Sequence, residues 1–208
     1  MAWGDFDNDG APDLLITGEQ WGWQRTIIYR NAYAVDSQFY AQIESDDVLP
    51  SAYGAAAWAD VNNDGALDFA VVGNNGLELR LNISTSDINA APSAPVNLSA
   101  DVAGTGATLK WDAATDAETD ADGLSYNISV WTGSPGDPVV APNADNATGR
   151  RRVADINGNA GHLRDDSGQR FFIHKGLTPG ETYYWKVQAI DAGLSGGAWS
   201  VESSFIVP

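Results

Sequence analysis

An internal repeat constrains the fold of this 208-residue chain more than any other feature. Residues 2–18 read AWGDFDNDGAPDLLITG and residues 57–73 read AWADVNNDGALDFAVVG, at a constant offset of 55 without a gap. A weaker match follows, in which residues 29–31 align with 80–82, so the second copy has a connection four residues shorter.

Each copy has the pattern of strands around a polar loop. A small residue and Trp precede the loop, and a short apolar strand is predicted after it, at 14–17 and at 69–72. Further runs rich in Ile, Tyr, Phe and Leu predict strands at 25–31, 39–44 and 77–82. No apolar period of 3.6 residues extends over a helical length. The sequence therefore predicts an all-β fold.

The loop in each copy follows the pattern Asp-x-[Asp/Asn]-x-Asp-Gly-x-x-Asp. Calcium takes six to eight oxygen ligands at about 2.3–2.6 Å, and a tight loop supplies them at alternate positions. Gly10 and Gly65, at position six, let the backbone turn sharply without a Cβ penalty. We therefore predict two calcium (Ca2+) sites, with side chains at positions one, three, five and nine and the carbonyl at position seven as ligands. These residues are Asp5, Asp7, Asp9, Ala11 and Asp13 in the first loop and Asp60, Asn62, Asp64, Ala66 and Asp68 in the second.

An acidic turn that binds nothing explains the first loop poorly. Four carboxylates within nine residues repel one another by roughly 1 kcal/mol per close pair even in water, and a turn needs only one or two Asp. An EF-hand requires a bidentate acid at position 12 and flanking helices, whereas position 12 is Ile16 or Val71 inside a predicted strand. Dockerin-type loops also lead into a helix. Because the first loop has one more carboxylate, we expect it to bind calcium more tightly than the second.

The unit AWGDFDNDGAPDLLITG resembles the FG-GAP/VCBS repeat of bacterial surface proteins and of integrin-type β-propellers. The resemblance implies that the Asp loop joins two strands of a blade and binds calcium, and that Trp3 and Trp58 begin the aromatic-Gly pair of the family. The family's propellers close with about seven blades, whereas this chain holds about one and a half repeats. We therefore expect incomplete propeller-like antiparallel β repeats with open sheet edges.

A change of composition marks a second domain. Residues 90–95 (AAPSAP) are expected to form a stiff linker, which places the repeat segment at 1–89 and the second domain at 96–208. No Asp-loop repeat occurs in the second domain, and residues 183–189 alternate as a half-buried strand does. Its predicted strands are 96–100, 108–111, 125–131, 170–175, 183–191 and 202–207.

The second domain resembles a fibronectin type III β-sandwich. The stretch 177–189 has the pattern Leu-x-Pro-x-x-x-Tyr-x-Trp-x-Val-x-Ala, which is similar to the tyrosine corner of these sandwiches. Trp111 corresponds to the core Trp of the second strand, and the alternating residues 126–130 correspond to the third strand. A longer insertion rich in Gly, Asn and Asp lies around 133–168. The tyrosine corner is structural and implies no chemistry.

Charge and composition exclude several classes of function. The formal net charge is −17, from 28 acids and 11 bases, so nucleic acid is not expected as a partner because its affinity depends on cationic contacts. The absence of Cys excludes disulfides and thiolate chemistry. No apolar run is long enough for a membrane span, and no signal peptide is present. Because Met1 directly precedes a repeat motif, we expect the chain to be part of a longer parent protein.

The leading hypothesis is a non-enzymatic, calcium-binding adhesion or ligand-binding segment, extracellular or at the cell surface, in which calcium is structural. Its partner is expected to be an unknown extracellular protein or glycan. A carbohydrate-binding accessory module is the alternative, because Trp21 and Trp23 beside Gly22 could stack on sugar rings. A glycosidase or lyase with paired carboxylates is disfavoured, since the well-spaced acids already belong to the metal loops.

Three other polar features occur in the sequence. The acidic stretch from Asp112 to Asp122 could bind a third ion, but it lacks the Gly and the spacing of the two loops, so a solvated loop is favoured. The basic cluster 150–152 is interpreted as a solvated turn rather than an anion site. His162 and His174 belong to no metal-type cluster and are assigned no role.

Overall fold

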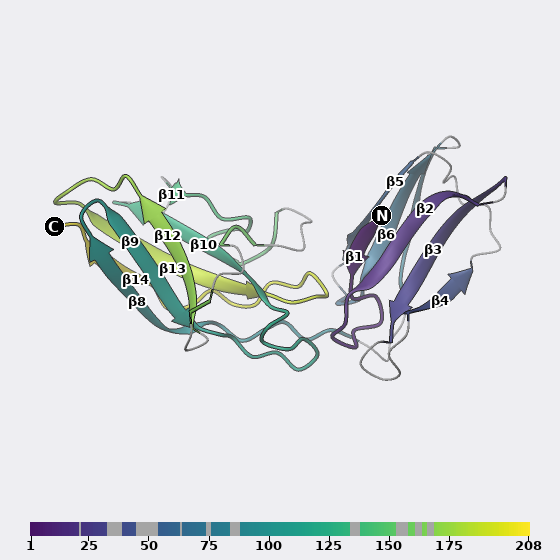
Figure 1. The fold of residues 1–208 in the computed structure, drawn as a ribbon, viewed down its shortest axis with the longest axis horizontal. Coiled ribbons are helices and arrows are strands. Elements are labelled where there is room, and N and C mark those ends of the chain that lie inside the picture. The colour runs from purple at the N-terminus through teal and green to yellow at the C-terminus, as the bar shows by residue number, and fades with distance from the viewer. Residues whose placement is uncertain are drawn as a thin grey trace. The chain divides into compact units, whose positions relative to one another are not determined.

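The structure is a computed structural model that describes residues 1–20, 22–32, 39–44, 54–62, 64–73, 76–83, 88–133, 138–152, 158–160, 164–165 and 169–208. Within these ranges the chain forms strands and turns and no α-helix, so the predicted all-β fold is confirmed. The chain divides into two compact units (Figure 1). The first unit is Met1–Ala90 with Ala192–Leu194, and the second is Ala91–Asp191 with Ser195–Pro208.

The first unit contains two antiparallel sheets. The first sheet has the order β1-β2-β3-β4 and the second sheet has the order β5-β6-β7. Their strands are β1 (Ala2–Gly4), β2 (Asp13–Gln20), β3 (Trp23–Asn31), β4 (Phe39–Glu44), β5 (Ala55–Ala59), β6 (Asp68–Gly73) and β7 (Gly76–Arg80). Each repeat motif therefore forms the first strand pair of one sheet, and its Asp loop joins the two strands of that pair.

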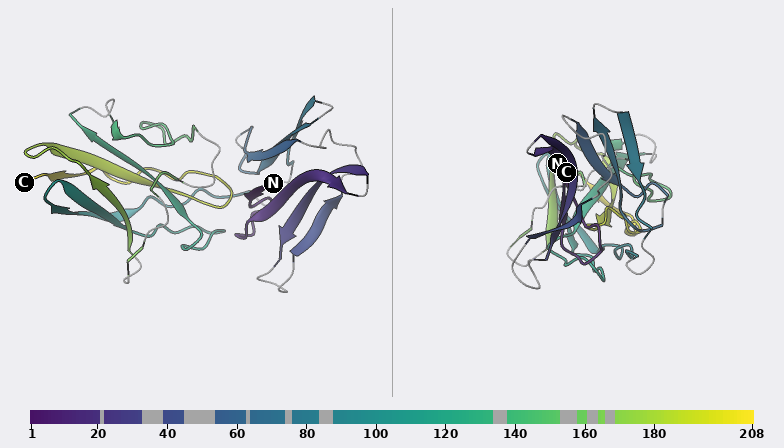
Figure 2. Two further views of the ribbon diagram at one scale, coloured as in Figure 1. Left: turned by 45° about the horizontal axis from the view of Figure 1, so that its top comes forward. Right: turned by 90° about the vertical axis from the view of Figure 1, so that its right-hand side faces the viewer.

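A small apolar core holds these two sheets together. Leu15 and Ile28 of the first sheet pack with Trp58 of the second, and Leu67 completes the buried cluster. Phe6 and Phe69 both contact the Trp58 ring, at centroid distances of 5.6 and 5.7 Å. Figure 2 shows the second sheet lying across one face of the first. The repeat thus buries its apolar side chains against its own second copy, as stacked repeats do.

The second unit is a sandwich of two antiparallel sheets with the orders β12-β9-β8 and β11-β10-β13-β14. In β13 the side chains of Tyr183, Trp185, Val187 and Ala189 are all buried, as predicted, but the alternation extends only from 182 to 187, because Gln188 and Ile190 are fully buried as well. The strands are β8 (Val96–Ala103), β9 (Gly106–Asp112), β10 (Ser125–Thr132), β11 (Pro138–Val140), β12 (Arg170–Lys175), β13 (Thr182–Ile190) and β14 (Ser203–Ile206).

The signature residues of the sandwich occupy the predicted places. The backbone N–H of Thr178 donates to the hydroxyl of Tyr183 at 2.9 Å, which is the hydrogen bond of a tyrosine corner. Trp111 is buried at the centre of the core, with ring centroids 5.5 Å from Tyr126 and 6.4 Å from Trp185. These aromatic contacts account for the tight packing of the two sheets against each other.

Three short strands were not predicted from the sequence. β1 (AWG) and β5 (AAAWA) precede the Asp loops and consist of Ala, Trp and Gly, and β11 has only three residues. None of them has the run of β-branched and aromatic residues by which a strand is recognised. The register with β2, β6 and β10 holds them in place, so their conformation depends on pairing rather than on local preference.

Candidate metal centre

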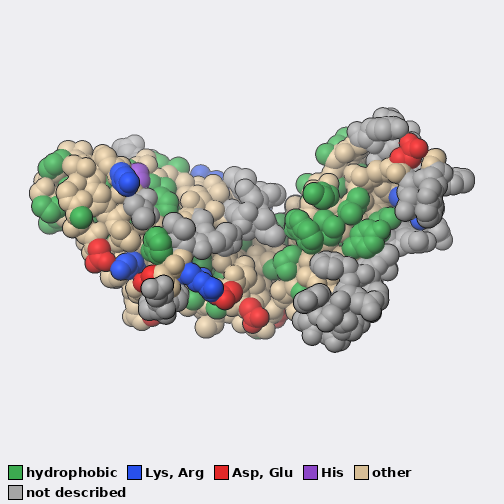
Figure 3. Space-filling model, in the orientation of Figure 1, with side chains coloured by type: hydrophobic (Ala, Val, Ile, Leu, Met, Phe, Trp, Pro, Cys, Tyr) green, Lys and Arg blue, Asp and Glu red, His purple; other side chains and the backbone are tan. Residues whose placement is uncertain are grey.

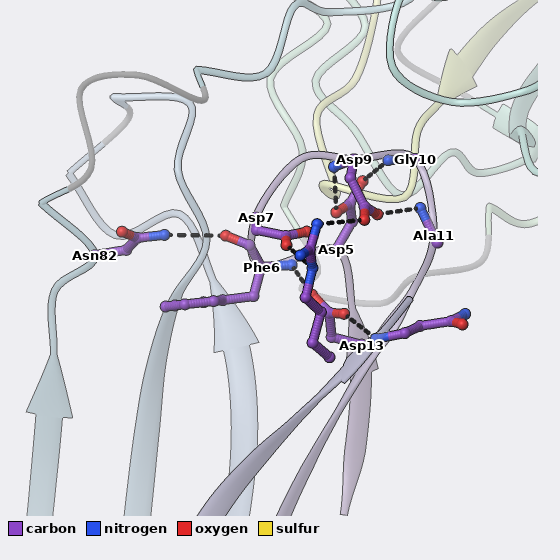
Figure 4. Close-up of polar contacts among 10 residues, drawn as sticks. Asp5, Phe6, Asp7, Asp9, Gly10, Ala11, Asp13 and Asn82 are labelled. Atoms are coloured by element: carbon purple, nitrogen blue, oxygen red, sulfur yellow. Dashed lines mark hydrogen bonds and ion pairs between the residues drawn. The ribbon is translucent and has the colours of Figure 1, made fainter. Parts of the chain in front are cut away.

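The first Asp loop is organised around a carboxylate that is buried at its start. Asp5 has no exposed surface. Its Oδ1 accepts a hydrogen bond from the N–H of Asp9 at 3.0 Å, and its Oδ2 accepts one from the N–H of Gly10 at 2.8 Å (Figure 4). Gly10 has a φ of +87°, a conformation that L side chains rarely adopt. The Gly at position six therefore allows the turn that wraps backbone N–H groups around Asp5.

Asp13 closes the loop from the other end. Its Oδ2 accepts a hydrogen bond from the N–H of Phe6, and its Oδ1 accepts one from the N–H of Asn31, each at 2.8 Å. Only 1% of Asp13 is exposed. Because Asn31 is the last residue of β3, this one carboxylate links the loop to the far end of the neighbouring strand.

Three of the predicted ligands converge. One carboxylate oxygen each from Asp5, Asp7 and Asp13 lies within 4.8 Å of the other two. Oxygens that share one calcium ion at about 2.3–2.6 Å can be at most about 5.2 Å apart, so the spacing fits this ion. Oδ1 of Asp7 is buried and has no hydrogen-bond partner within the described part of the chain. An all-oxygen donor set with an unsatisfied carboxylate oxygen suits a hard cation such as calcium.

The other two predicted ligand residues of this loop are Asp9 and Ala11, and Asp9 forms hydrogen bonds within the protein. Asp9 Oδ1 accepts a hydrogen bond from the N–H of Ala11 at 3.0 Å, and Asp9 Oδ2 accepts one from Nη2 of Arg30 at 3.0 Å. The group of converging oxygens consequently comprises three carboxylates and does not include Asp9.

Arg30 is a component of the site that sequence reasoning missed. Its Nε pairs with Oδ2 of Asp7 while its Nη2 pairs with Asp9, so the guanidinium bridges two predicted ligands. The charge of Asp7 raises the pKa of Arg30 further above its ordinary value. The repeat alignment contains a signal for this residue. Arg30 aligns with Leu81, so the second copy has no charge at this position.

Burial makes the negative charge of the first loop costly. Desolvation raises the pKa of Asp5 to about 7 and that of Asp13 to about 6. The pKa of Asp7 is also raised, first by burial and then by the charge of Asp9. At neutral pH these carboxylates therefore favour either a proton or a bound cation.

The second loop repeats the backbone hydrogen bonds of the first. The N–H groups of Asp64 and Gly65 donate to Oδ1 and Oδ2 of Asp60, each at 3.1 Å. Gly65 has a φ of +85°. Asp68, which is fully buried, accepts hydrogen bonds from Val61 N–H at 2.9 Å and Asn82 N–H at 2.8 Å. These contacts match those of Asp5 and Asp13, so the sequence repeat is also a structural repeat.

The remaining ligands of the second loop bond to one another. Asn62 Nδ2 donates to Asp64 Oδ2 at 2.8 Å, and the N–H of Ala66 donates to Asp64 Oδ1 at 2.9 Å. Asn62 stands at position three, where the first loop has Asp7. The second loop therefore has the same shape with one fewer carboxylate.

The acidic stretch from Asp112 to Asp122 has a different organisation. Asp116 Oδ1 accepts hydrogen bonds from backbone N–H groups of its own turn, and Asp122 pairs with Arg164 at 2.6 Å and with Arg170 at 3.0 Å. Within the described residues these acids form no converging group of three. Arg164 and Arg170 thus account for Oδ1 of Asp122 and the backbone of the turn accounts for Oδ1 of Asp116, whereas Oδ2 of Asp116 is buried and has no hydrogen-bond partner among the described residues.

The other sequence-derived candidates either lie outside the described residues or contact neighbours in their own unit. Trp21 and His162 lie outside the described residues, as does the side chain of Trp23. His174 stacks on Phe172 at a centroid distance of 6.3 Å. In the basic cluster, Arg152 pairs with Asp145 of the same loop. No helix in the described part of the chain has the length and hydrophobicity to cross a membrane.

Comparison with known proteins identifies both units. The FG-GAP-like repeat family matches residues 5–71, and the fibronectin type III domain family matches residues 92–206, more than half of the chain. No curated protein matches the chain significantly.

Similar solved structures include the third fibronectin III domain of human KIAA0343 protein, at 21% identity and a TM-score of 0.38, covering 61% of this chain and 91% of that one. The chicken interferon gamma receptor alpha chain is 12% identical with a TM-score of 0.37, covering 94% and 97%. A cytokine receptor complex chain is 14% identical with a TM-score of 0.37, covering 92% and 83%. By its family match, the chain belongs to the fibronectin type III family and carries an FG-GAP-like repeat ahead of that domain.

Proposed function

We propose that this chain is an extracellular adhesion or ligand-binding segment whose FG-GAP-like repeat is stabilised by two structural calcium ions. The observation that carries the proposal is the convergence of Asp5, Asp7 and Asp13 in a loop whose backbone hydrogen bonds recur in the second copy. FG-GAP-like repeats and fibronectin type III domains are typical of extracellular proteins and are typically non-catalytic binding modules. Fibronectin type III domains often bind protein ligands.

The calcium ion would stabilise the loop that connects two paired strands. Asp5 and Asp13 already fasten the loop to the backbone at both ends, and Asp7 contributes a buried oxygen without a protein partner among the described residues. A cation there would neutralise carboxylates that burial makes unfavourable, so its binding energy would contribute to folding. Extracellular modules with dissociation constants of about 10⁻⁴–10⁻³ M are roughly half to nine-tenths occupied at about 1 mM calcium.

Arg30 alters the expected ranking of the two sites. The second loop has three carboxylates and a neutral Asn62. The first loop has four carboxylates, but Arg30 pairs with two of them. The formal charge of the first loop together with Arg30 is therefore −3, the same as that of the three carboxylates of the second loop. The advantage expected from the extra carboxylate is therefore reduced, because a calcium ion must compete with the guanidinium for Asp7 and Asp9.

A reciprocal exchange at position three tests the calcium sites. Asp7→Asn gives the first loop the residue of the second, and Asn62→Asp does the reverse, without changing side-chain size. We expect calorimetric titration of chelator-treated protein to show two calcium ions per chain. Asp7→Asn should weaken one site about tenfold, and Asn62→Asp should strengthen the other by a similar factor, since about 1.4 kcal/mol corresponds to tenfold. Absence of calcium binding by the unsubstituted chain would refute the proposal.

Replacement of Arg30 tests its competition with calcium. Arg30→Leu introduces the residue that stands at the aligned position, Leu81. Because a partly exposed ion pair contributes about 0.2–1 kcal/mol, we expect the calcium affinity of the first loop to rise by up to about fivefold, measured by the same titration. Arg80→Leu is the control, since Arg80 pairs with Glu78 outside both loops. An unchanged or lower affinity in Arg30→Leu would contradict the competition.

A further inference from the structure

The second sheet of the first unit has two apolar faces. One face carries Trp58 and Phe69 and packs against the first sheet. Strand pairing places a different set of side chains on the opposite face, because residues directly across an antiparallel pair share a face. These residues are Ala55 and Ala57 of β5, Ala70 and Val72 of β6, and Leu77 and Leu79 of β7.

This opposite face, called here the acceptor face, is exposed. Leu77 is 75% exposed, Leu79 is 47% exposed and Val72 is 45% exposed. Val72 lies directly across from Leu77, and Ala70 lies across from Leu79, so the side chains form one continuous apolar surface without a charged residue. A contiguous apolar surface of this kind marks an interaction site.

The repeat itself indicates what covers such a face. Ala70 and Leu79 correspond in the repeat to Leu15 and Ile28 of the first sheet. In the first sheet these two positions are 0% and 2% exposed, because Trp58 of the second sheet packs on them. The exposed face of the second sheet is therefore the equivalent of the face that Trp58 covers on the first sheet.

A matching surface is exposed at the other end of the repeat. Trp3 occupies the position of Trp58 in the first copy, yet Trp3 is 45% exposed whereas Trp58 is 3% exposed. Trp3 lies across from Leu14, on the face of the first sheet opposite to Leu15. We call this the donor face. Figure 3 shows hydrophobic side chains gathered on the visible side of the first unit.

We propose that the acceptor face binds the donor face of a second copy of this chain, so that copies associate head to tail. This inference goes beyond the proposed calcium-dependent function. The contact would reproduce between chains the packing that the two sheets make within one chain, with Trp3 of the second copy in the role of Trp58. Because donor and acceptor are different surfaces, the interface is heterologous, and every open assembly keeps one free donor face and one free acceptor face at its ends.

A complementation experiment tests this interface. Leu77→Lys blocks the acceptor face and Trp3→Lys blocks the donor face, and both substitutions add one positive charge at an exposed position. By sedimentation velocity in calcium, the unsubstituted chain should associate further as its concentration rises, whereas each variant alone should stay at the 22.0 kDa of the monomer. An equimolar mixture of the two variants should form a one-to-one heterodimer and nothing larger, because each variant retains one intact face.

The control is Val201→Lys, which changes an apolar residue of the second unit that is 88% exposed. It should associate as the unsubstituted chain does. Circular dichroism and the melting temperature establish that the variants are folded. A monomeric unsubstituted chain at every concentration, a mixture of variants that stays monomeric, or loss of association in Val201→Lys would each overturn the proposal.

Discussion

In excess chelator, the first unit is expected to be most stable near pH 4 and to lose stability as the pH rises through about 6 to 7. The reason is the burial of Asp5 and Asp13, which raises their pKa values to about 7 and about 6. An unfolded Asp has a pKa of about 3.9. The folded state therefore binds protons more tightly than the unfolded state, and this stabilisation is complete below the unfolded pKa and disappears above the folded one.

The expected loss of stability is large for a single titrating carboxyl group. A pKa that rises from 3.8 to about 7 corresponds to roughly 4 kcal/mol, at 1.36 kcal/mol for each pH unit. Calcium should prevent this loss of stability at neutral pH, because a bound cation neutralises the buried carboxylates as protons do at low pH. Melting temperatures followed by calorimetry between pH 4 and pH 8, with chelator and with millimolar calcium, measure both curves.

Asp5→Asn provides the control for this pH dependence. The amide keeps the size of the side chain and does not titrate, so the fall in melting temperature with rising pH in chelator should become smaller. A melting temperature of the first unit that increases steadily from pH 4 to pH 8 in chelator would contradict the assignment of the effect to buried carboxylates.

Trp58→Ala is expected to destabilise the first unit by about 3–5 kcal/mol, the usual cost of truncating a buried Trp. The indole contacts the rings of Phe6 and Phe69, and its Nε1 donates to the carbonyl of Ala2 at 3.2 Å. Truncation removes the largest side chain from a core that also contains only a few aliphatic residues. Denaturant unfolding followed by circular dichroism measures the loss.

Trp3→Ala is the matched control, since Trp3 stands at the same place in the other copy of the motif. Because Trp3 is 45% exposed, its truncation should cost no more than about 1 kcal/mol in protein dilute enough to be monomeric. Equal losses for the two variants would contradict the packing of the two sheets.

Much of the fold could be predicted from residues close together in the chain. The tyrosine corner depends on Thr178 and Tyr183, five residues apart, and β13 depends on an alternation that is visible in the sequence. The strands that were missed, such as β1 and β5, lack the run of β-branched and aromatic residues by which the other strands were recognised.

In the candidate metal loops, too, contacts between residues close in the chain could be predicted and contacts between strands could not. The backbone bonds of Asp5 to Asp9 and Gly10 lie within six residues, so the spacing of Asp and Gly was sufficient to predict the turn. The contribution of Arg30 could not be predicted in this way, because Arg30 reaches Asp7 and Asp9 only when β3 pairs with β2.

The sequence by itself therefore determined the local elements: the two Asp loops, the strands with clear alternation, the tyrosine corner and the two families. Only the tertiary structure decided which of two equivalent residues is buried. Trp3 and Trp58 share one motif, yet one is exposed and the other forms the core. The physical reason is that local bonds follow from neighbours in the chain, whereas burial depends on which sheet lies across a face.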